Sequence, residues 1–258
     1  MTLTYPNIDS FDFYIYPREV GANKCILLHN LGACILDAAG LAAAHRGFGM
    51  NDMHAQGKAW VVSRMMIDIV RMPKEYEMVT ISTWVSQIST VTSTRLFCIT
   101  DKEGNILATS STYWSIIDIQ TRRMVNLIET TNLKENIIDT SAELPQIVNP
   151  QRVDVPRNAM PQATHSHRVV YSDIDINCHV NSMKYLQWSI DTLSQQYLIS
   201  HKLKQCHINF THEALAEQNI NIQHYNDTAV DTPAPHSHIF TLTNEENIVC
   251  CKILLIDN

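Results

Sequence analysis

Three polar side chains with complementary chemistry lie close together around residues 175 to 179. Asp175, Asn177 and His179 are spaced two residues apart, just ahead of a stretch with helical periodicity. In an extended approach to that helix, these alternate side chains would project to the same side. The free N–H groups and the positive dipole end of the helix would point to the same place. A carboxylate, an amide and an imidazole so placed suit the hydrolysis of an acyl group, whereas the plain alternative is a solvated turn whose Asp and Asn only cap the helix.

The composition restricts the classes of function. With 258 residues, 45% of them hydrophobic and 17% charged, the chain can form one large domain or two of modest size. Its net charge of −7 argues against a nucleic-acid partner, which would need a basic face. Residues 1–10 lack a basic stretch followed by an apolar run, and no apolar segment approaches the ~20 residues that span a bilayer. We therefore expect a cytoplasmic protein with no membrane partner, and we interpret its seven cysteines as reduced thiols.

Two stretches have the periodicity of amphipathic helices. Small residues dominate the first, so we expect a sheet to approach its backbone closely, which would justify the ~1 kcal/mol of helix propensity that Gly40 costs. The apolar stripes comprise Leu31, Cys34, Ile35, Ala38, Leu41, Ala42 and His45 in the first stretch and Met183, Leu186, Ile190, Leu193 and Tyr197 in the second.

Alternating patterns predict long antiparallel strands, and part of the pattern recurs. One strand is predicted where Val79, Ile81, Thr83 and Val85 alternate with Thr80, Ser82 and Trp84, and residues 107–117 are rich in the types that strands favour. A strand, a polar turn and a second strand occur at 97–118 and again at 240–257. A helical stretch precedes each hairpin, one opened by residues 29–31 and the other by residues 179–181. We therefore predict an internal duplication.

The duplication predicts an α+β fold in which each half is one helix with several long antiparallel strands. We place the N-terminal domain at residues 1–125 and the C-terminal domain at residues 163–258. Residues 126–162 carry four prolines among polar side chains and have little periodicity, so we interpret them as a linker.

Taken together, these features resemble the acyl-acyl carrier protein thioesterase family. The pattern Asp-x-Asn-x-His-Val-Asn at residues 175–181 stands at the second helix start, and shorter matches follow a fairly specific order in the first half. Those matches are Ala59–Arg64 ahead of Met72-Pro73, Thr83-Trp84, Arg95-Leu96-Phe97, Tyr113-Trp114-Ser115, Asp118 and Thr121-Arg122-Arg123. The resemblance covers nearly the whole chain and implies a double hotdog, in which each of two tandem domains has a helix wrapped by a curved antiparallel sheet. It also implies that the N-terminal domain shapes the acyl pocket and that the C-terminal domain carries the chemistry.

The resemblance implies a catalytic set of Asp175, Asn177, His179 and a glutamate on a later strand, for which Glu213 is the match. Alternation along residues 206–213 independently places Glu213 on a polar strand face, although the plain alternative is a solvated strand end. Plant members have a cysteine next to this glutamate. Here that position is Ala214, which excludes a cysteine nucleophile there.

A thioester needs only a positioned water, a base and a group that polarises its carbonyl, so we expect no metal and no other cofactor. Glu213 or Asp175 would activate water or attack the carbonyl itself, and the sequence does not separate these roles. His179 would protonate the leaving thiol, while Asn177 would hold the water or donate to the oxyanion with the N–H groups of residues 180–181. The histidine pairs at 165–167 and 236–238, which we expect in edge segments, lack metal-finger spacing and are not interpreted as zinc ligands.

The favoured function is release of a fatty acid from acyl carrier protein in fatty acid biosynthesis, with the acyl chain carried on the partner's phosphopantetheine arm. Two alternatives stay open. One is a hotdog acyl-CoA thioesterase, because members of that group share His-Val-Asn ahead of a tyrosine such as Tyr185. The other is a noncatalytic acyl-binding hotdog protein, in which we would expect Asp175, His179 or Glu213 to be lost.

The carrier protein raises a question of charge. Acyl carrier proteins are typically acidic, so a chain of net charge −7 needs a local basic surface to dock one. The candidates for this surface are Arg152, Arg157, Arg168, Lys184, Lys202 and Lys204. The sequence leaves open the acyl chain length and whether the chain forms a homodimer.

Overall fold

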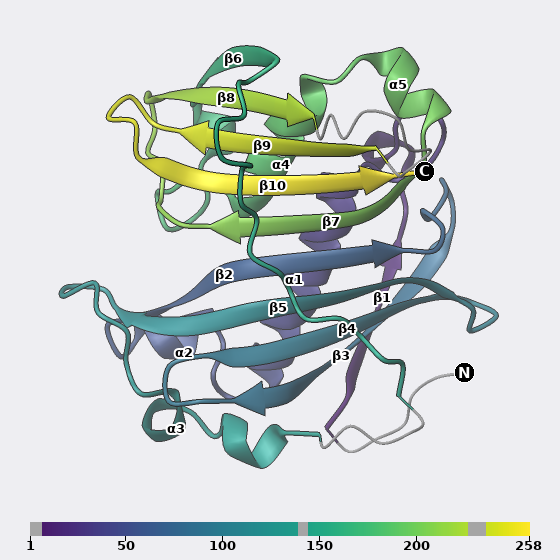
Figure 1. Ribbon diagram of the computed structural model, residues 1–258. Helices are drawn as coiled ribbons and strands as arrows, with labels where there is room; N and C mark the ends of the chain where they lie inside the picture. The colour runs from purple at the N-terminus through teal and green to yellow at the C-terminus, as the bar shows by residue number, and fades with distance from the viewer. Residues whose placement is uncertain (1–6, 139–143, 227–235) are drawn as a thin grey trace. The chain divides into compact units, whose positions relative to one another are not determined.

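The computed structural model describes residues 7–138, 144–226 and 236–258, and the chain divides into two compact units, Met1–Pro150 and Gln151–Asn258. In each unit a helix packs against an antiparallel sheet, the hotdog arrangement that the resemblance implied (Figure 1). The division between the units falls within the 126–162 segment. Within the described residues, no helix is long and apolar enough to cross a membrane.

The first unit has the strand order β1-β3-β4-β5-β2, with antiparallel neighbours throughout. Its strands are β1 (Asp9–Tyr14), β2 (Lys58–Ile69), β3 (Met78–Ile88), β4 (Ser93–Asp101) and β5 (Ile106–Asp118). Its helices are α1 (Leu28–His45), α2 (Met50–His54) and α3 (Leu127–Thr130), with 3-10 turns at Pro17–Glu19 and Leu133–Asn136.

The second unit repeats this topology, with the strand order β6-β8-β9-β10-β7. Each strand of the first unit therefore has a counterpart five strands later in the chain, and both orders follow the same path. The strands are β6 (Ala163–Arg168), β7 (Leu203–Phe210), β8 (Asn219–Asn226), β9 (Ser237–Thr243) and β10 (Val249–Asp257). The helices are α4 (Ser182–Asp191) and α5 (Gln195–Ser200), with a 3-10 turn at Tyr171–Asp173. The recurrence of hairpins that the sequence pattern indicated thus reflects a recurrence of the whole sheet.

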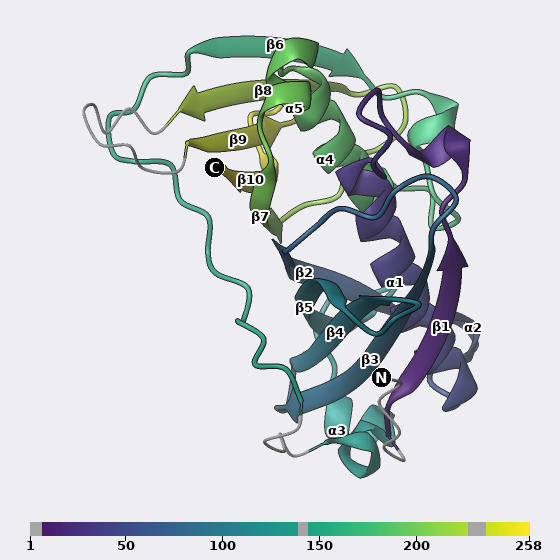
Figure 2. The same cartoon turned by 90° about the vertical axis from the view of Figure 1, so that its right-hand side faces the viewer.

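Helix α1 packs against β1 and β3 of its own unit (Figure 2). Leu31, Ile35 and Ala38 are fully buried on this face, as the periodicity predicted. Gly40 differs from the expectation, because a Cβ placed there would meet nothing within 4 Å. Leu41 is 44% exposed, so the predicted stripe is buried only in part. The small side chains buried on α1 are therefore alanines, and the packing does not explain Gly40.

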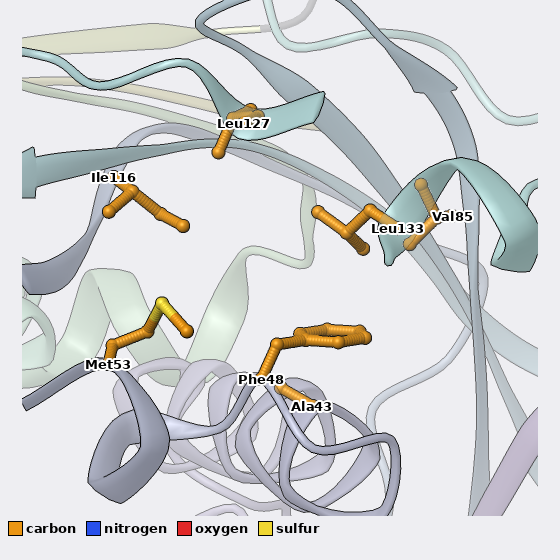
Figure 3. Close-up of a cluster of buried hydrophobic side chains, with 7 residues drawn as sticks. All are labelled: Ala43, Phe48, Met53, Val85, Ile116, Leu127 and Leu133. Carbon is orange, nitrogen blue, oxygen red and sulfur yellow. The ribbon is translucent and has the colours of Figure 1, made fainter. Parts of the chain in front are cut away.

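A cluster of apolar side chains fills the space beyond the end of α1 (Figure 3). Phe48 and Met53, from the residues that follow α1, pack with Val85 of β3 and Ile116 of β5. Leu127 and Leu133 also belong to this cluster, although they come from the segment interpreted as a linker. Burial of each such leucine stabilises the fold by about 1.5–3 kcal/mol, so the first part of that segment is anchored to the first unit.

Gly49 is the glycine that this corner requires. A Cβ on Gly49 would lie 2.8 Å from the Cα of Ala44, so another residue type would force the backbone of α1 away. Gly47 has a φ of +77°, which ends α1 in the conformation that glycine adopts readily. The residues from 46 to 49 thus terminate α1.

The second apolar stripe extends over two helices. Helix α4 ends at Asp191, and Ser194 begins α5 by accepting a hydrogen bond from the Tyr197 N–H (3.2 Å). Tyr197 therefore lies on α5. The break follows from the strong preference of serine for the N-cap position, which the periodicity alone does not reveal.

Tyr197 belongs to a buried polar network at the end of β9 and β10. Its hydroxyl donates to the carboxylate of Asp257 and lies 2.6 Å from Nε2 of His238. His238 Nδ1 in turn lies 2.9 Å from Nε2 of His224, whose ring stacks on Phe240. Strand β9 lies between β8 and β10, so the expectation that the 236–238 pair occupies an edge segment is wrong for His238.

Protonation of this network opposes folding. Burial, with the nearby His238 and His165, lowers the pKa of His224 from its usual 6.5 to about 4. Burial also lowers the pKa of His238. The unfolded chain takes up a proton on His224 below pH 6.5 while the folded chain does not, so the stability from its neutral form is lost as pH falls from 6.5 towards 4.

We predict that lowering the pH from 7 to 5 reduces the free energy of unfolding by about 1–2 kcal/mol through this pair. Thermal unfolding followed by circular dichroism at each pH measures the effect. His224→Phe, which keeps a ring on Phe240, should flatten the pH dependence, while His54→Phe at an exposed position should leave it unchanged. Equal slopes for the wild type and His224→Phe would contradict the prediction.

Candidate active site

The residues from Asp175 to His179 form a tight turn. Ile174 and Val180 pair as an isolated antiparallel bridge on either side of it. The Asp175 N–H donates to the His179 carbonyl (2.8 Å), and the Cys178 N–H donates to the Asp175 carbonyl (3.0 Å). The expected extended approach with alternating side chains is therefore wrong. The reversal occurs because Cys178 adopts a φ of 63°, a left-handed conformation that its residue type does not signal.

The carboxylate of Asp175 holds this turn together. Its Oδ1 accepts hydrogen bonds from the main-chain N–H groups of Asn177 (2.8 Å) and His179 (3.4 Å). Asn177 Nδ2 donates to Oδ2 across a long 3.5 Å. Asp175 thus has part of the turn-forming role that we considered as the plain alternative.

Helix α4 begins at Ser182 and is capped by Asn181, whose Oδ1 accepts from the Met183 N–H (2.9 Å). His179 and Val180 therefore precede the helix instead of opening it. The main-chain N–H groups expected at an oxyanion are also engaged, because that of Val180 donates to the Ala214 carbonyl (2.9 Å) and that of Asn181 to the Asp173 carbonyl (2.8 Å).

The side chains of His179 and Glu213 pair with each other. Nε2 of His179 lies 3.3 Å from Oε2 of Glu213, and their side chains are 28% and 35% exposed. Glu213 lies in the loop after β7, which ends at Phe210, so the strand position inferred from alternation is wrong. The alternation along residues 206–213 also put Asn209 on the polar face, but Asn209 is 6% exposed and its side chain bonds the main chain of residues 151 and 153. A polar residue in this stretch therefore does not mark a solvated strand face. The structure thus brings Asp175 to Asn177 and His179 to Glu213.

Asp173 is a further charged residue at the site. It is 4% exposed, and its Oδ2 lies 2.9 Å from Nε2 of His167 and accepts from the Val170 N–H (3.0 Å). Lys184 Nζ lies 3.5 Å from Oδ1. Burial disfavours the charge, but these partners outweigh it and lower the pKa of Asp173. Sequence reasoning missed this residue, although it continues the two-residue spacing of Asp175 and Asn177.

The first unit contains the same turn. Val20 and Ile26 form its antiparallel bridge, the Gly21 N–H donates to the Cys25 carbonyl (2.9 Å), and Lys24 has a φ of 62°. The Ile26 N–H donates to the Pro73 carbonyl (2.8 Å), as that of Val180 does to Ala214. In this equivalence, Gly21, Asn23, Cys25 and Met72 take the places of Asp175, Asn177, His179 and Glu213.

Comparison of the two turns shows which of the site residues the backbone conformation does not require. The first turn forms with the same main-chain hydrogen bonds but with glycine, cysteine and methionine where the second has its ionisable side chains. The backbone therefore does not require a carboxylate, an imidazole and a second carboxylate at these positions. Their presence together, in the turn and in the loop that the Val180–Ala214 hydrogen bond joins to it, indicates a functional site, by the same reasoning that assigns clustered acid-base groups to catalysis.

Family models match almost the whole of both units. The acyl-ACP thioesterase N-terminal domain matches residues 9–132, and the acyl-ACP thioesterase C-terminal domain, which includes all four expected site residues, matches residues 158–255. The chain belongs to the acyl-ACP thioesterase family. The resemblance read from the sequence is thereby confirmed.

Curated members of this family are chloroplast enzymes of plants. The palmitoyl-acyl carrier protein thioesterase of Cuphea hookeriana is 24% identical over 202 residues, which are 74% of this chain and 48% of that protein. The protein of the same name from Gossypium hirsutum is 26% identical over 222 residues, covering 79% of this chain and 51% of the relative. The chain thus spans about half the length of the curated relatives it matches.

Solved structures of family members have the same fold. An acyl-ACP thioesterase from Bacteroides thetaiotaomicron superposes with a TM-score of 0.84 at 25% identity, covering 98% of each chain. The 12:0-ACP thioesterase of Umbellularia californica has a TM-score of 0.81 at 19% identity, covering 98% of this chain and 94% of that one. Within the described residues, no three side chains of His, Cys, Asp or Glu are placed to hold a metal ion.

The left-handed backbone of Cys178 should affect the stability of the fold. Cys178→Gly should leave the free energy of unfolding unchanged or raise it by up to about 1 kcal/mol, because glycine adopts this φ without strain. Cys178→Val should lower it by about 1–2 kcal/mol, because a β-branched side chain is disfavoured there. Thermal unfolding of the two variants tests this. A valine variant as stable as the wild type would contradict the geometry of the turn.

Proposed function

We propose that the protein hydrolyses the thioester of acyl-acyl carrier protein and releases the free fatty acid. The observation that carries this proposal is the His179–Glu213 pair, because the turn and the loop that hold it are joined by the same main-chain hydrogen bond in the first unit without either group. Membership of the acyl-ACP thioesterase family supports the same substrate class. The noncatalytic alternative predicted loss of a site residue, but all four are present.

The geometry supports a division of labour in which His179 moves protons. With its Nε2 3.3 Å from Glu213, the imidazole takes a proton from the attacking water and later gives it to the departing thiolate. Glu213 orients the ring and stabilises its cationic form. Water oxygen forms the new bond to the acyl carbon, the carbon–sulfur bond breaks, and the products are a carboxylic acid and a thiol.

In this proposal Asp175 fixes the conformation of the turn, and Asn177 contributes a hydrogen bond to the substrate. Because Asp175 is bonded to the main chain of its own turn, we assign it the task of holding His179 in place rather than that of nucleophile. Among the described residues, the side-chain amide of Asn177 has a single long bond of 3.5 Å, to Asp175, so we assign that amide as a donor to the thioester carbonyl. A donor aimed at the developing oxyanion stabilises the transition state by about 3 kcal/mol.

His179→Ala and Glu213→Ala should each lower kcat by at least ~100-fold, since each removes a member of the proton-transfer pair. Thiol release from acyl-ACP measures the effect, and circular dichroism checks that the variants fold. His212→Ala is the matched control, because His212 is the exposed neighbour of Glu213 and bonds a main-chain carbonyl of β10. Near wild-type turnover of either site variant would refute the assignment, and equal turnover of acyl-CoA would shift weight to that substrate.

The basic residues proposed for docking fall in different parts of the second unit. Lys202 and Lys204 stand at the start of β7, whereas Glu213 follows its other end. The rise of an extended strand separates these two ends by roughly 25 Å. Arg152 pairs with Asp154 (3.0 Å), and Lys184 pairs with the buried Asp173. Exposed Arg168, at the end of β6 and close in the chain to Asp175, is the member of the set that we favour for contact with an acidic carrier protein.

Electrostatic docking should make the reaction sensitive to salt. The Debye length falls from about 10 Å at 0.1 M to 3 Å at 1 M, so kcat/KM for acyl-ACP should fall as salt rises, while that for a short soluble thioester should hardly change. Arg168→Glu should lower kcat/KM for acyl-ACP at low salt, and Lys202→Glu, at the far end of β7, is its control. Equal salt responses of the two substrates would count against this docking surface.

A further inference from the structure

Ala214, the residue that follows Glu213, is held by two hydrogen bonds from different elements. The Ala214 carbonyl accepts from the Val180 N–H (2.9 Å), and the Ala214 N–H donates to the hydroxyl of Tyr185 on α4 (3.1 Å). Ala214 is fully buried and Tyr185 is 3% exposed. Since Glu213 and His179 are the residues immediately before Ala214 and Val180, these two bonds set the distance between the acid and the base.

The Tyr185 bond occurs in only one of the two equivalent turns. Counted from the helix N-caps, Leu27 and Asn181, the position of Tyr185 is occupied by Leu31 in the first unit. The position of Ala214 is occupied there by Pro73, which has no N–H to donate. The unit that lacks the acid-base pair thus lacks both the donor and the acceptor of this bond, while it keeps the main-chain bond from Ile26 to Pro73 (2.8 Å).

We propose that Tyr185 is a positioning residue, whose hydroxyl holds the loop after β7 so that Glu213 stays in contact with His179. The aromatic ring is fixed independently, by packing against Trp188 (5.6 Å between ring centroids) and Phe210 (6.4 Å). Burial raises the pKa of Tyr185 above its usual range, so the hydroxyl stays neutral. The expected effect of Tyr185 on kcat rests on the proposed function, whereas its hydrogen bond to Ala214 does not.

Tyr185→Phe removes the hydroxyl and keeps the ring. We expect kcat for acyl-ACP to fall about 10-fold, the rate equivalent of one hydrogen bond of ordinary strength, with KM changed less than about 2-fold. Ala214→Pro removes the same bond from the donor side and copies the first unit, so it should have a similar effect. Tyr197→Phe, which removes a half-buried hydroxyl from the network beside β9, is the control for a general loss of stability and should keep the wild-type kcat.

A double-mutant cycle distinguishes positioning from general damage. If Tyr185 acts through Glu213, then Tyr185→Phe should cause no further loss in a Glu213→Ala background. The same 10-fold loss in both backgrounds, or an unchanged kcat in Tyr185→Phe alone, would overturn the proposal.

Hydrogen exchange tests the anchor without substrate. The Ala214 amide should exchange at least about 10-fold faster in Tyr185→Phe than in the wild type, because it loses its acceptor. An unchanged exchange rate would overturn the proposal whatever the enzyme hydrolyses. If the wild type fails to cleave acyl-ACP but the Ala214 amide still exchanges faster in Tyr185→Phe, the result would overturn the proposed function and leave the positioning role of Tyr185 standing.

Discussion

The site depends on one main-chain hydrogen bond, which runs from the Val180 N–H to the Ala214 carbonyl and joins the turn before α4 to the loop after β7. It brings together two segments that are distant in sequence, and the residues just before its donor and acceptor are His179 and Glu213. A bond between backbone groups does not depend on side-chain identity. The same bond therefore persists from Ile26 to Pro73 in the first unit, although none of the ionisable groups of the second turn occur there.

The charges around this bond are held in two different ways. Asp173 is buried, and its carboxylate is compensated by His167, Lys184 and a main-chain N–H, which together outweigh the desolvation cost. The side chains of His179 and Glu213, by contrast, are 28% and 35% exposed and pair with each other at 3.3 Å. The site thus combines a buried, compensated carboxylate with a partly exposed histidine–glutamate pair.

The sequence predicted the elements better than their ends. Period, alternation and residue type located α1, β3 and β5 because these elements are long, and the polar spacing singled out Asp175 and His179 as candidates. The turn was missed because its reversal depends on a left-handed Cys178, a residue type that rarely adopts this conformation. Glu213 was placed on a strand because side-chain type does not reveal where β7 ends, and Asp173 was missed because its burial depends on partners from β6 and α4.

The duplicated turn also bears on how a loss of activity at the site should be read. Asn23 stands where Asn177 stands, and its side-chain oxygen accepts a hydrogen bond from the Cys25 N–H (3.0 Å), so an amide at this position can stabilise the turn. In the second turn Asp175 accepts the bond from the corresponding N–H, that of His179. In the roles proposed above, this difference leaves the side chain of Asn177 for a substrate carbonyl and ties Asp175 to the backbone of His179. On that proposal, removal of Asp175 should disturb the position of His179 as well as the local charge, whereas removal of Asn177 should act chiefly on the bound thioester.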